Sequence, residues 1–455
     1  MRSSLLICTA VCLAAAQDVI ERDIAILGGG ATGTYAGVYL GDLGKSIVVI
    51  EKKDRLGGQT QTYFDPATGR PVNYGVMFYH DDAIVHNFHA RLSVPLVGPG
   101  AGGSVSGVFA DFSEGVVVND FAVPPIGSDY TNELRKYPYL ENGFLLPDNI
   151  PEDLLLTWPE YIEKYNVNQS AIATFNAPSP AGNPLKRLAL YQFNFVSSVM
   201  IDQLSGHIVQ NANGDNHEIY RKAEAEFGAE NVLLSSTVVS GNRSAAGVEL
   251  VVSTPTGEKT IRAKQLVVAA PPQAGNLAPI GLDARESRIL SQIGGYPFYS
   301  GVVRDTGLPA GFRFSNVGVD NEFHVPDLPG MILLSPSSTV EGLYTYTYSS
   351  LQPMTQAQVE SAAAASIKNL QVALQGKGSN MNAEPVFVAF ADDSPFHPEQ
   401  SADSIRNGFY RDMYALQGYR NTWYISSLFV LSASQLWNNT AALLPDIVAA
   451  ADATH

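Results

Sequence analysis

The chain has 455 residues, of which 45% are hydrophobic, and 44 Asp and Glu against 28 Lys and Arg give it a net charge of −16. A protein this acidic repels polyanions, so we expect no nucleic-acid partner. The length is enough for two domains with a sizeable core.

Residues 1–16 have the composition of a secretory signal peptide. Arg2 supplies a positive charge, an apolar stretch follows, and Ala14, Ala15 and Ala16 offer the small side chains of a cleavage site. This stretch is too short to span a membrane, and no later stretch reaches the roughly 18 apolar residues that a spanning helix needs. We therefore expect a secreted protein with no membrane span.

Both cysteines, Cys8 and Cys12, lie inside the predicted signal peptide. Cleavage would leave a protein without cysteine, which excludes disulfides, a thiolate nucleophile, a thiolate metal site and a cysteine-linked cofactor. In the secretory pathway three Asn-x-Ser/Thr triplets become glycan acceptors, at Asn168, Asn242 and Asn438.

A strand expected over residues 24–27 runs into a glycine turn. Gly28, Gly30 and Gly33 have the G-x-G-x-x-G spacing of a dinucleotide-binding fingerprint. The first glycine permits the tight turn, and the second lets the backbone approach a pyrophosphate. The third lets the following helix, expected over 34–43, lie close to the strand.

Phosphate and ribose contacts follow from this layout. The N–H groups of Ala31 and Thr32, at the start of the helix, carry partial positive charge and suit a phosphate. Glu51 ends the next strand, expected over 46–51, where its carboxylate can accept hydrogen bonds from both ribose hydroxyls. This βαβ unit predicts a bound dinucleotide.

The pattern changes beyond this unit. Residues 81–204 contain scattered prolines and predict the helices and loops of an inserted domain. Further strands are expected over 231–239, 248–253, 259–263, 265–270, 384–390 and 422–426, and helices over 356–374 and 434–450. Alternation places Tyr344, Tyr346 and Tyr348 on one face of another strand.

An Arg-Leu-Gly-Gly run containing Arg55, Gly57 and Gly58 follows the acid. The glycine fingerprint, the acid and this run together resemble the flavin-containing amine oxidase superfamily, in which the second glycine pair approaches FAD. Three runs are also similar to secreted fungal FAD-dependent oxidoreductases of the β-cyclopiazonate dehydrogenase type, namely residues 44–58, 65–69 and 74–76.

The resemblance implies FAD as the cofactor and an α/β fold of two domains, as in amine oxidases. A Rossmann-like FAD-binding domain would comprise residues 17–80, 205–285 and 395–455, and an inserted α+β substrate domain residues 81–204 and 286–394. Besides the residues above, the resemblance implies FAD contacts from Lys52, Gln59, Thr60, Gly75, Val76 and Val238.

The sequence departs from the superfamily near the flavin. Gln59 stands where relatives often have His or Arg, so a histidyl-flavin bond is impossible at this position. Neither a C-terminal acid around residues 426–429 nor the lysine that commonly holds a water near flavin N5 is evident. These departures bear on amine oxidation and not on FAD binding.

Tyr296, Tyr299, Tyr346 and Trp423 are the candidates for a substrate pocket, because aromatic walls bind flat or cationic molecules. The alternative is that these side chains pack a core, as aromatic residues on strands commonly do. The sequence predicts neither a catalytic residue nor an oligomeric state.

His80, Asp81, Asp82, His86 and His89 lie close together in the sequence. Two of these histidines share a helical face, but solvated surface histidines are the commoner arrangement, so we expect no metal. His80 stays open as a neighbour or covalent anchor of the flavin.

These features together predict a secreted FAD-dependent oxidase or dehydrogenase. It would take hydride from a small organic molecule, such as an amine or a secondary metabolite, onto flavin N5. Little NAD(P)H is present outside the cytosol, so we expect dioxygen as the electron acceptor. Two alternatives remain, a redox-neutral flavin-dependent isomerase and a non-catalytic FAD-fold binding protein.

Overall fold

The computed structural model describes residues 18–98, 106–177 and 181–454. The predicted signal peptide, with both cysteines, lies outside the described residues. In the described part of the chain, no helix combines the length and apolar character needed to cross a membrane.

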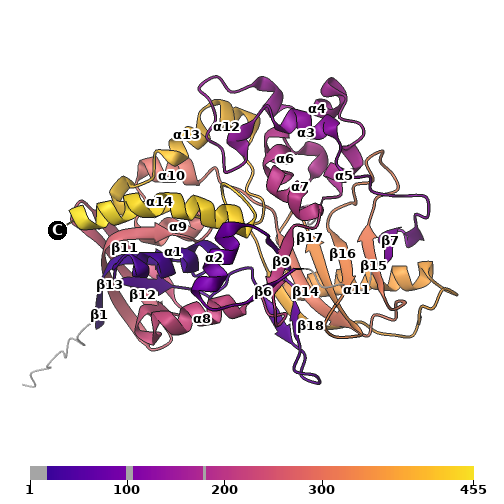
Figure 1. Cartoon of the computed structure of the whole chain (residues 1–455), viewed down its shortest axis with the longest axis horizontal. Coiled ribbons are helices and arrows are strands. Elements are labelled where there is room, and N and C mark those ends of the chain that lie inside the picture. The colour runs from indigo at the N-terminus through magenta and orange to yellow at the C-terminus, as the bar shows by residue number, and fades with distance from the viewer. Residues whose placement is uncertain (1–17, 99–105, 178–180, 455) are drawn as a thin grey trace, which may run out of the picture.

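A seven-stranded sheet forms one half of the molecule (Figure 1). Its strand order is β10-β2-β1-β13-β12-β11, with β19 also paired to β13. The strands are β1 (Asp18–Leu27), β2 (Ile47–Ile50), β10 (Val232–Leu233), β11 (Thr237–Ser244), β12 (Gly247–Thr254), β13 (Gly257–Val268) and β19 (Thr422–Tyr424). β10, β2, β1, β13 and β19 pair in parallel, whereas β11, β12 and β13 form an antiparallel meander.

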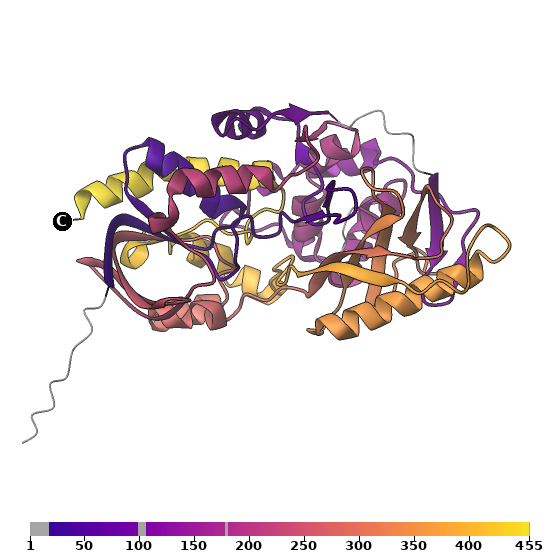
Figure 2. The ribbon, with the colours of Figure 1, turned by 90° about the horizontal axis from the view of Figure 1, so that it is seen from below.

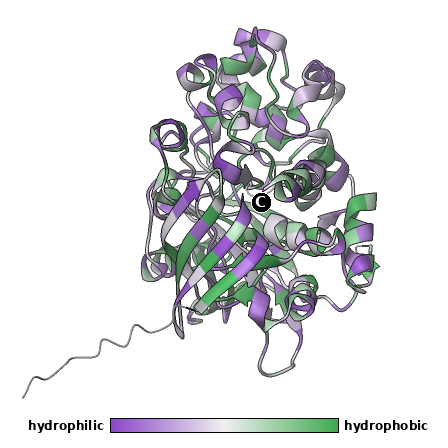
Figure 3. Ribbon diagram, turned by 90° about the vertical axis from the view of Figure 1, so that its left-hand side faces the viewer, coloured by the Kyte–Doolittle hydropathy of each residue, from purple (hydrophilic) through white to green (hydrophobic). Residues whose placement is uncertain are grey.

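The parallel strands are apolar on both faces because helices or loops cover each side. Ile24 and Ile26 of β1 join a core with α1 (Ala31–Asp42) and α14 (Ala433–Ala453), whereas Ala25 joins a second core on the opposite face. Tyr35 of α1 stacks on Trp437 of α14 at 6.0 Å between ring centroids. The strands facing the viewer in Figure 3 show alternating hydrophobic and hydrophilic bands, as expected for strands with one solvated face.

Three predicted elements have different bounds in the structure. The helix expected from residue 34 begins at Ala31, because Gly30 is already its N-cap. The strand expected over 231–239 is divided into β10 and β11, and Ser235 between them has a positive φ of 48°. The two strands expected over 259–263 and 265–270 are one long strand, β13.

A second seven-stranded sheet lies in the other half, in the order β18-β14-β17-β16-β15-β7-β8. Its strands are β7 (Ser106–Asp111), β8 (Val116–Val117), β14 (Phe298–Arg304), β15 (Phe312–Asn316), β16 (Gly330–Pro336), β17 (Leu343–Ser349) and β18 (Val386–Asp392). Helix α11 (Gln356–Ala373) lies along one face of this sheet (Figures 1 and 2). Tyr344, Tyr346 and Tyr348 all join the core under α11, which confirms that they share a face.

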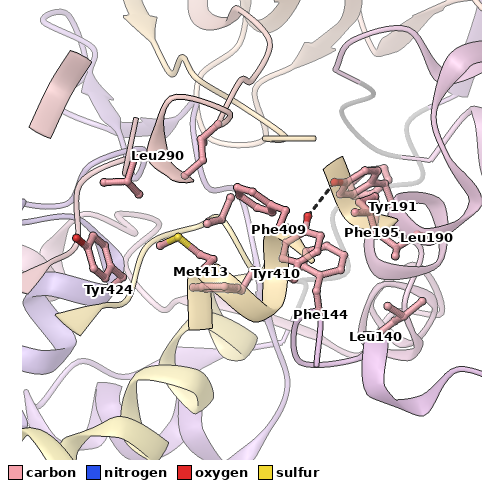
Figure 4. Packing of buried hydrophobic residues seen from close by; sticks show 14 of the residues in the cluster. Leu140, Phe144, Leu190, Tyr191, Phe195, Leu290, Phe409, Tyr410, Met413 and Tyr424 are labelled. Atoms are coloured by element: carbon pink, nitrogen blue, oxygen red, sulfur yellow. Dashed lines mark hydrogen bonds between the residues drawn. The ribbon is translucent and has the colours of Figure 1, made fainter. Parts of the chain in front are cut away.

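Small helices stand above the second sheet in Figure 1 and meet the first half through a shared core. They are α3 (Ser128–Leu134), α4 (Trp158–Tyr165), α5 (Ala171–Phe175), α6 (Ala189–Phe195) and α7 (Ser198–Leu204). Figure 4 shows Tyr191 of α6 beside Phe144 and Tyr410, the last from α13 (Phe409–Tyr414). The hydroxyl of Tyr410 donates to that of Tyr191 at 2.8 Å, so the two halves are joined by packing and by a buried hydrogen bond.

The remaining elements complete the framework. They are β3 (Thr62–Phe64), β4 (Pro71–Asn73), β5 (Tyr79–His80), β6 (Leu96–Val97), β9 (Ile208–Asn211), α2 (Ala83–Arg91), α8 (Glu218–Phe227), α9 (Ala274–Leu277), α10 (Ala284–Leu290) and α12 (Ala402–Arg406). α2 falls in the segment predicted for the substrate domain, yet Phe88 packs edge-on against Trp437 of α14 at 4.9 Å. The exact domain bounds stay a prediction.

Candidate functional site

A cavity of about 370 Å³ opens at the carboxyl ends of β1 and β2, where ligands bind in sheets of this type. From there it extends to the end of β18 and to the start of α14. Its lining includes Leu27, Ile50, Lys53, Tyr220, Ser236, Thr237, Ala269, Ala270, Pro271, Asn276, Asp392, Asp393, Ser394, Pro395, Ser427, Leu431, Ala433 and Leu436.

A larger hollow of about 490 Å³ lies at the opposite edge of the sheet, where Asp42 ends α1 and Ile47 begins β2. Neither the glycine turn nor Glu51 lines it. The chemistry suited to a dinucleotide therefore belongs to the first cavity.

Most of the predicted cofactor residues line the first cavity together. These are Gly28, Gly30, Ala31, Thr32, Glu51, Lys52, Gly57, Gly58, Gln59, Thr60, Val76 and Val238. They come from four separate parts of the first sheet and its loops, so the fold assembles a single site from the sequence motifs.

Two glycine turns meet at this cavity with no room for side chains. Gly28 has a φ of 103°, and a Cβ there would lie 2.8 Å from the amide nitrogen of Ala270. A Cβ on Gly58 would lie 3.0 Å from the Cα of Gly30. The bare backbone of both turns thus forms a cradle against which a pyrophosphate can lie closely.

The start of α1 supplies donors to the same cradle. Gly30 is the N-cap and no side chain caps the helix, so the first N–H groups are available to a bound anion. Ala31 and Thr32 of this first turn line the cavity. This donor set fits the phosphates of a dinucleotide.

Glu51 is fixed at the end of β2 by two backbone hydrogen bonds. One carboxylate oxygen accepts from the N–H of Gly29 at 2.7 Å and the other from the N–H of Lys53 at 2.8 Å. The side chain is 6% exposed. Each oxygen keeps a further lone pair, so a rigidly placed acceptor remains for ribose hydroxyls.

Gly33, Arg55 and Gly75 do not line the cavity but support the residues that do. A Cβ on Gly33 would lie 1.9 Å from the carbonyl oxygen of Gly28, and one on Gly75 would lie 1.9 Å from that of Gln59. Arg55 donates to the carbonyl of Thr60 at 3.1 Å. In this geometry they shape the cavity through other residues, and direct contacts of these three with FAD stay a prediction.

The four predicted pocket aromatics lie elsewhere, and none of them lines the cavity. Tyr299 and Tyr346 are 1% exposed and belong to the core under α11. Trp423 donates from its indole nitrogen to the side-chain oxygen of Gln265 at 3.0 Å. Tyr296 donates to Glu399 at 3.3 Å. These contacts correspond to the packing alternative, and a role in substrate binding stays a prediction.

The histidine cluster also lies away from the cavity. His80 pairs with Asp82 at 3.2 Å and with Asp202 at 2.7 Å, and His86 pairs with Asp81 at 2.6 Å. Within the described ranges no three His, Cys, Asp or Glu side chains are grouped as metal ligands.

Sequence reasoning missed a buried carboxyl group at the far end of the cavity. Asp393 follows β18 and is 6% exposed. Its carboxyl oxygens accept hydrogen bonds from the amide of Gln61 at 3.0 Å and from the hydroxyl of Ser300 at 2.8 Å. Burial raises the pKa of Asp393 to about 6, against the lowering effect of these two donors and of Lys53. No local motif marks this residue, because its partners lie far away in the sequence.

Lys53 lines the cavity, and its charge interacts with both Glu51 and Asp393. Its ammonium group donates to the carbonyl of Gly58 at 3.1 Å. Burial lowers its pKa, although Asp393 and Glu51 oppose that effect.

A small cavity of about 20 Å³ adjoins the main one, and Ser427 and Leu431 line both. His397 lines the small cavity and has a positive φ of 47°. Its buried Nε2 atom has no hydrogen-bond partner in the described part of the chain. The described part of the chain therefore leaves one buried ring nitrogen, Nε2 of His397, unpaired at the junction of the two halves.

Comparison with known proteins agrees with this geometry. Residues 26–92 match a family described as an NAD(P)-binding Rossmann-like domain. The chain is 48% identical to the FAD-dependent oxidoreductase dbaF of Emericella nidulans, over 96% of this chain and 93% of that protein. It belongs to this family of FAD-dependent oxidoreductases. It is also 30% identical to beta-cyclopiazonate dehydrogenase of Aspergillus flavus, over 94% of this chain and 93% of that protein.

Solved structures share the fold of this FAD-dependent oxidoreductase at low sequence identity. A fatty acid isomerase from P. acnes superposes with a TM-score of 0.73 at 16% identity, over 93% of this chain and 98% of that one. Cyclohexylamine oxidase from Brevibacterium oxydans gives a TM-score of 0.66 at 18% identity, over 95% of this chain and 99% of that one. The predicted α/β fold, its likeness to the fold of amine oxidases and FAD as the cofactor are confirmed.

Proposed function

We propose that this FAD-dependent oxidoreductase is exported and oxidises a small organic molecule, with dioxygen as the final electron acceptor. The composition of residues 1–16 supports export. Outside the cytosol dioxygen is the available oxidant. The family membership supports hydride removal from carbon, and beta-cyclopiazonate dehydrogenase among the relatives suggests a secondary metabolite as the substrate.

The observation that carries the proposal is the extent of the main cavity. One end has the glycine cradle, the start of α1 and Glu51, which suit the phosphates and a ribose. The other end reaches Asp393 and Ser427, where the two halves of the molecule meet. A cofactor anchored at the first end would extend toward this junction, which is where we place the substrate.

Bound FAD supplies a hydride acceptor at N5 of its ring system. The residues of the chain supply binding and orientation. The backbone of the two glycine turns and of α1 would hold the phosphates, Glu51 would hold a ribose, and Val238, which lines the same cavity, would contact the adenine. At the other end Asp393 and its partners Gln61 and Ser300 are buried, so they could orient a substrate against the flavin.

The test uses the full chain recovered from culture medium. We expect a flavin absorbance spectrum, bleaching of that spectrum by the correct amine, alcohol or indole without air, and peroxide equal to the reduced flavin when air enters. Protein retained inside the cells would contradict export, and reoxidation without peroxide would contradict the oxidase reaction.

The same measurements separate the alternatives. Because one structural neighbour is a fatty acid isomerase, unsaturated fatty acids belong in the substrate panel. Product formation without net oxygen consumption would favour a redox-neutral isomerase. Purified protein that carries no flavin and takes none up would favour a non-catalytic protein.

A further inference from the structure

Two buried carboxyl groups line the main cavity in different surroundings. Glu51 accepts hydrogen bonds from two backbone N–H groups at the nucleotide end. Asp393 accepts from the side chains of Ser300 and Gln61 at the junction end. Its backbone carbonyl also accepts from the amide of Gln59 at 2.9 Å. The carboxyl of Asp393 is therefore held from both halves of the molecule.

Burial and the neighbouring charge of Lys53 act in opposite directions on the pKa of Asp393. Lys53 favours the carboxylate, and Asp392 opposes it. Burial raises the pKa of the Tyr74 phenol, the charge of Arg55 opposes that effect, and the charge of Asp393 adds to it. Burial outweighs these effects and raises the pKa of Asp393 to about 6. A group that titrates near the working pH is suited to proton transfer.

The other ionisable side chains on this lining are less suited to the role. Lys53 already donates to a backbone carbonyl, and Lys52 and Asp392 are exposed. Tyr220 has a pKa raised to about 12 by burial, so it keeps its proton at neutral pH. Among the side chains that line the main cavity, Asp393 is therefore the buried group at the junction end that is suited to accept a proton.

We propose that Asp393 is the proton acceptor of the oxidation, taking the N–H or O–H proton of an amine or alcohol substrate. This inference rests on the proposed function. In the step, the C–H bond next to the heteroatom breaks and its electron pair leaves with hydrogen as hydride to FAD. The N–H or O–H proton passes to the carboxylate of Asp393 and a C=N or C=O double bond forms. The substrate thus loses two electrons and two hydrogens.

The first experiment needs no substrate. The midpoint potential of the flavin is measured against pH in the holoenzyme, with dithionite as the reductant. Reduction adds negative charge beside Asp393 and raises its affinity for a proton. We expect the parent protein to take up one additional proton per electron pair above about pH 6, between the pKa values of Asp393 before and after reduction, and we expect this uptake to be lost in Asp393→Asn and retained in Asp392→Asn.

The second experiment follows flavin reduction by the substrate in single turnover. In the parent protein the rate is expected to rise with pH as the carboxylate forms. Asp393→Asn is expected to be about 100-fold slower or more at neutral pH and to lose this dependence. Ser300→Ala removes a donor to the carboxylate, so the midpoint of the profile is expected to move to higher pH while turnover persists.

The outcomes distinguish the two proposals. An unchanged proton count and pH profile in Asp393→Asn overturn the assignment of Asp393, whatever the substrate proves to be. In a second possible outcome, Asp393→Asn loses the additional proton uptake as expected, but no amine or alcohol reduces the flavin. This result overturns the proposed oxidation of these substrates and with it the role of Asp393 as their proton acceptor. An identical profile in Ser300→Ala contradicts the hydrogen-bond basis of the proposal.

Discussion

The raised pKa of Asp393 predicts that this residue destabilises the folded protein at neutral pH. Burial raises the pKa from 3.8 to about 6, so the folded state binds its proton more tightly than the unfolded state does. The protonated carboxyl group therefore contributes to the stability of the folded state. This contribution is fully present below about pH 4 and is lost as the pH rises through about 6. A difference of about two pKa units corresponds to about 3 kcal/mol.

Asp393→Asn replaces the titrating group with a neutral one of similar shape. Relative to the parent protein, the variant is expected to gain up to about 3 kcal/mol between about pH 4 and about pH 7. Unfolding entropies near 2.1 cal/mol/K per residue make this gain worth about 3 °C in the melting temperature for a chain of this length. The assay is the thermal unfolding of flavin-free protein at several pH values.

The matched control is Asp392→Asn, because Asp392 is adjacent but exposed. Removing its charge lowers the pKa of Asp393 slightly, so the melting temperature of Asp392→Asn is expected to keep the pH dependence of the parent protein with its midpoint at slightly lower pH. A difference in melting temperature between Asp393→Asn and the parent protein that is the same at every pH would come only from the altered hydrogen bonds. A difference that does not grow between acid and neutral pH would refute the link between burial and the pKa of this carboxyl.

Three further predictions concern the framework and the nucleotide end. Gly33→Ala would place a Cβ 1.9 Å from a backbone oxygen, so the flavin content of the purified protein is expected to fall. The control Gly41→Ala in the same helix meets open space and is expected to raise the melting temperature slightly. Equal flavin content in the two variants would contradict the close approach at Gly33. Glu51→Ala is expected to weaken FAD binding at least tenfold by equilibrium titration, and an unchanged affinity would remove its ribose role. Glu286→Ala leaves the fully buried Arg243 without its carboxylate partner and is expected to cost about 3–5 kcal/mol in denaturant unfolding, which a loss below 1 kcal/mol would contradict.

The part of the site that sequence predicts well is local in the chain. Gly28, Gly30 and Glu51 belong to one βαβ unit, so their spacing determines their geometry. Asp393 could not be predicted in this way, because its environment is created by contacts with Gln61 and Ser300 across long separations. Burial, which no residue type reveals by itself, then decides its pKa.

The fold shows the same division between local and distant information. Apolar runs predicted most strands, but the strand expected over 231–239 is broken at Ser235, where a positive φ ends the extended conformation. Aromatic residues on a strand can line a pocket or pack in a core, and their spacing in the sequence does not distinguish the two. Tyr346 alternates correctly along its strand, yet the face that it occupies packs under α11.

The hydrogen bonds from Gln59 and Gln61 to Asp393 link cofactor binding to the contact between the two halves of the molecule. Both glutamines follow the second glycine turn, and their amides donate to the backbone and carboxyl oxygens of a residue from the second half. A cofactor that orders this turn would therefore strengthen the contact between the two halves, and that contact would in return favour cofactor retention by the same free energy. A substrate that binds at this junction and strengthens the same contacts is therefore expected to slow the loss of the flavin as well.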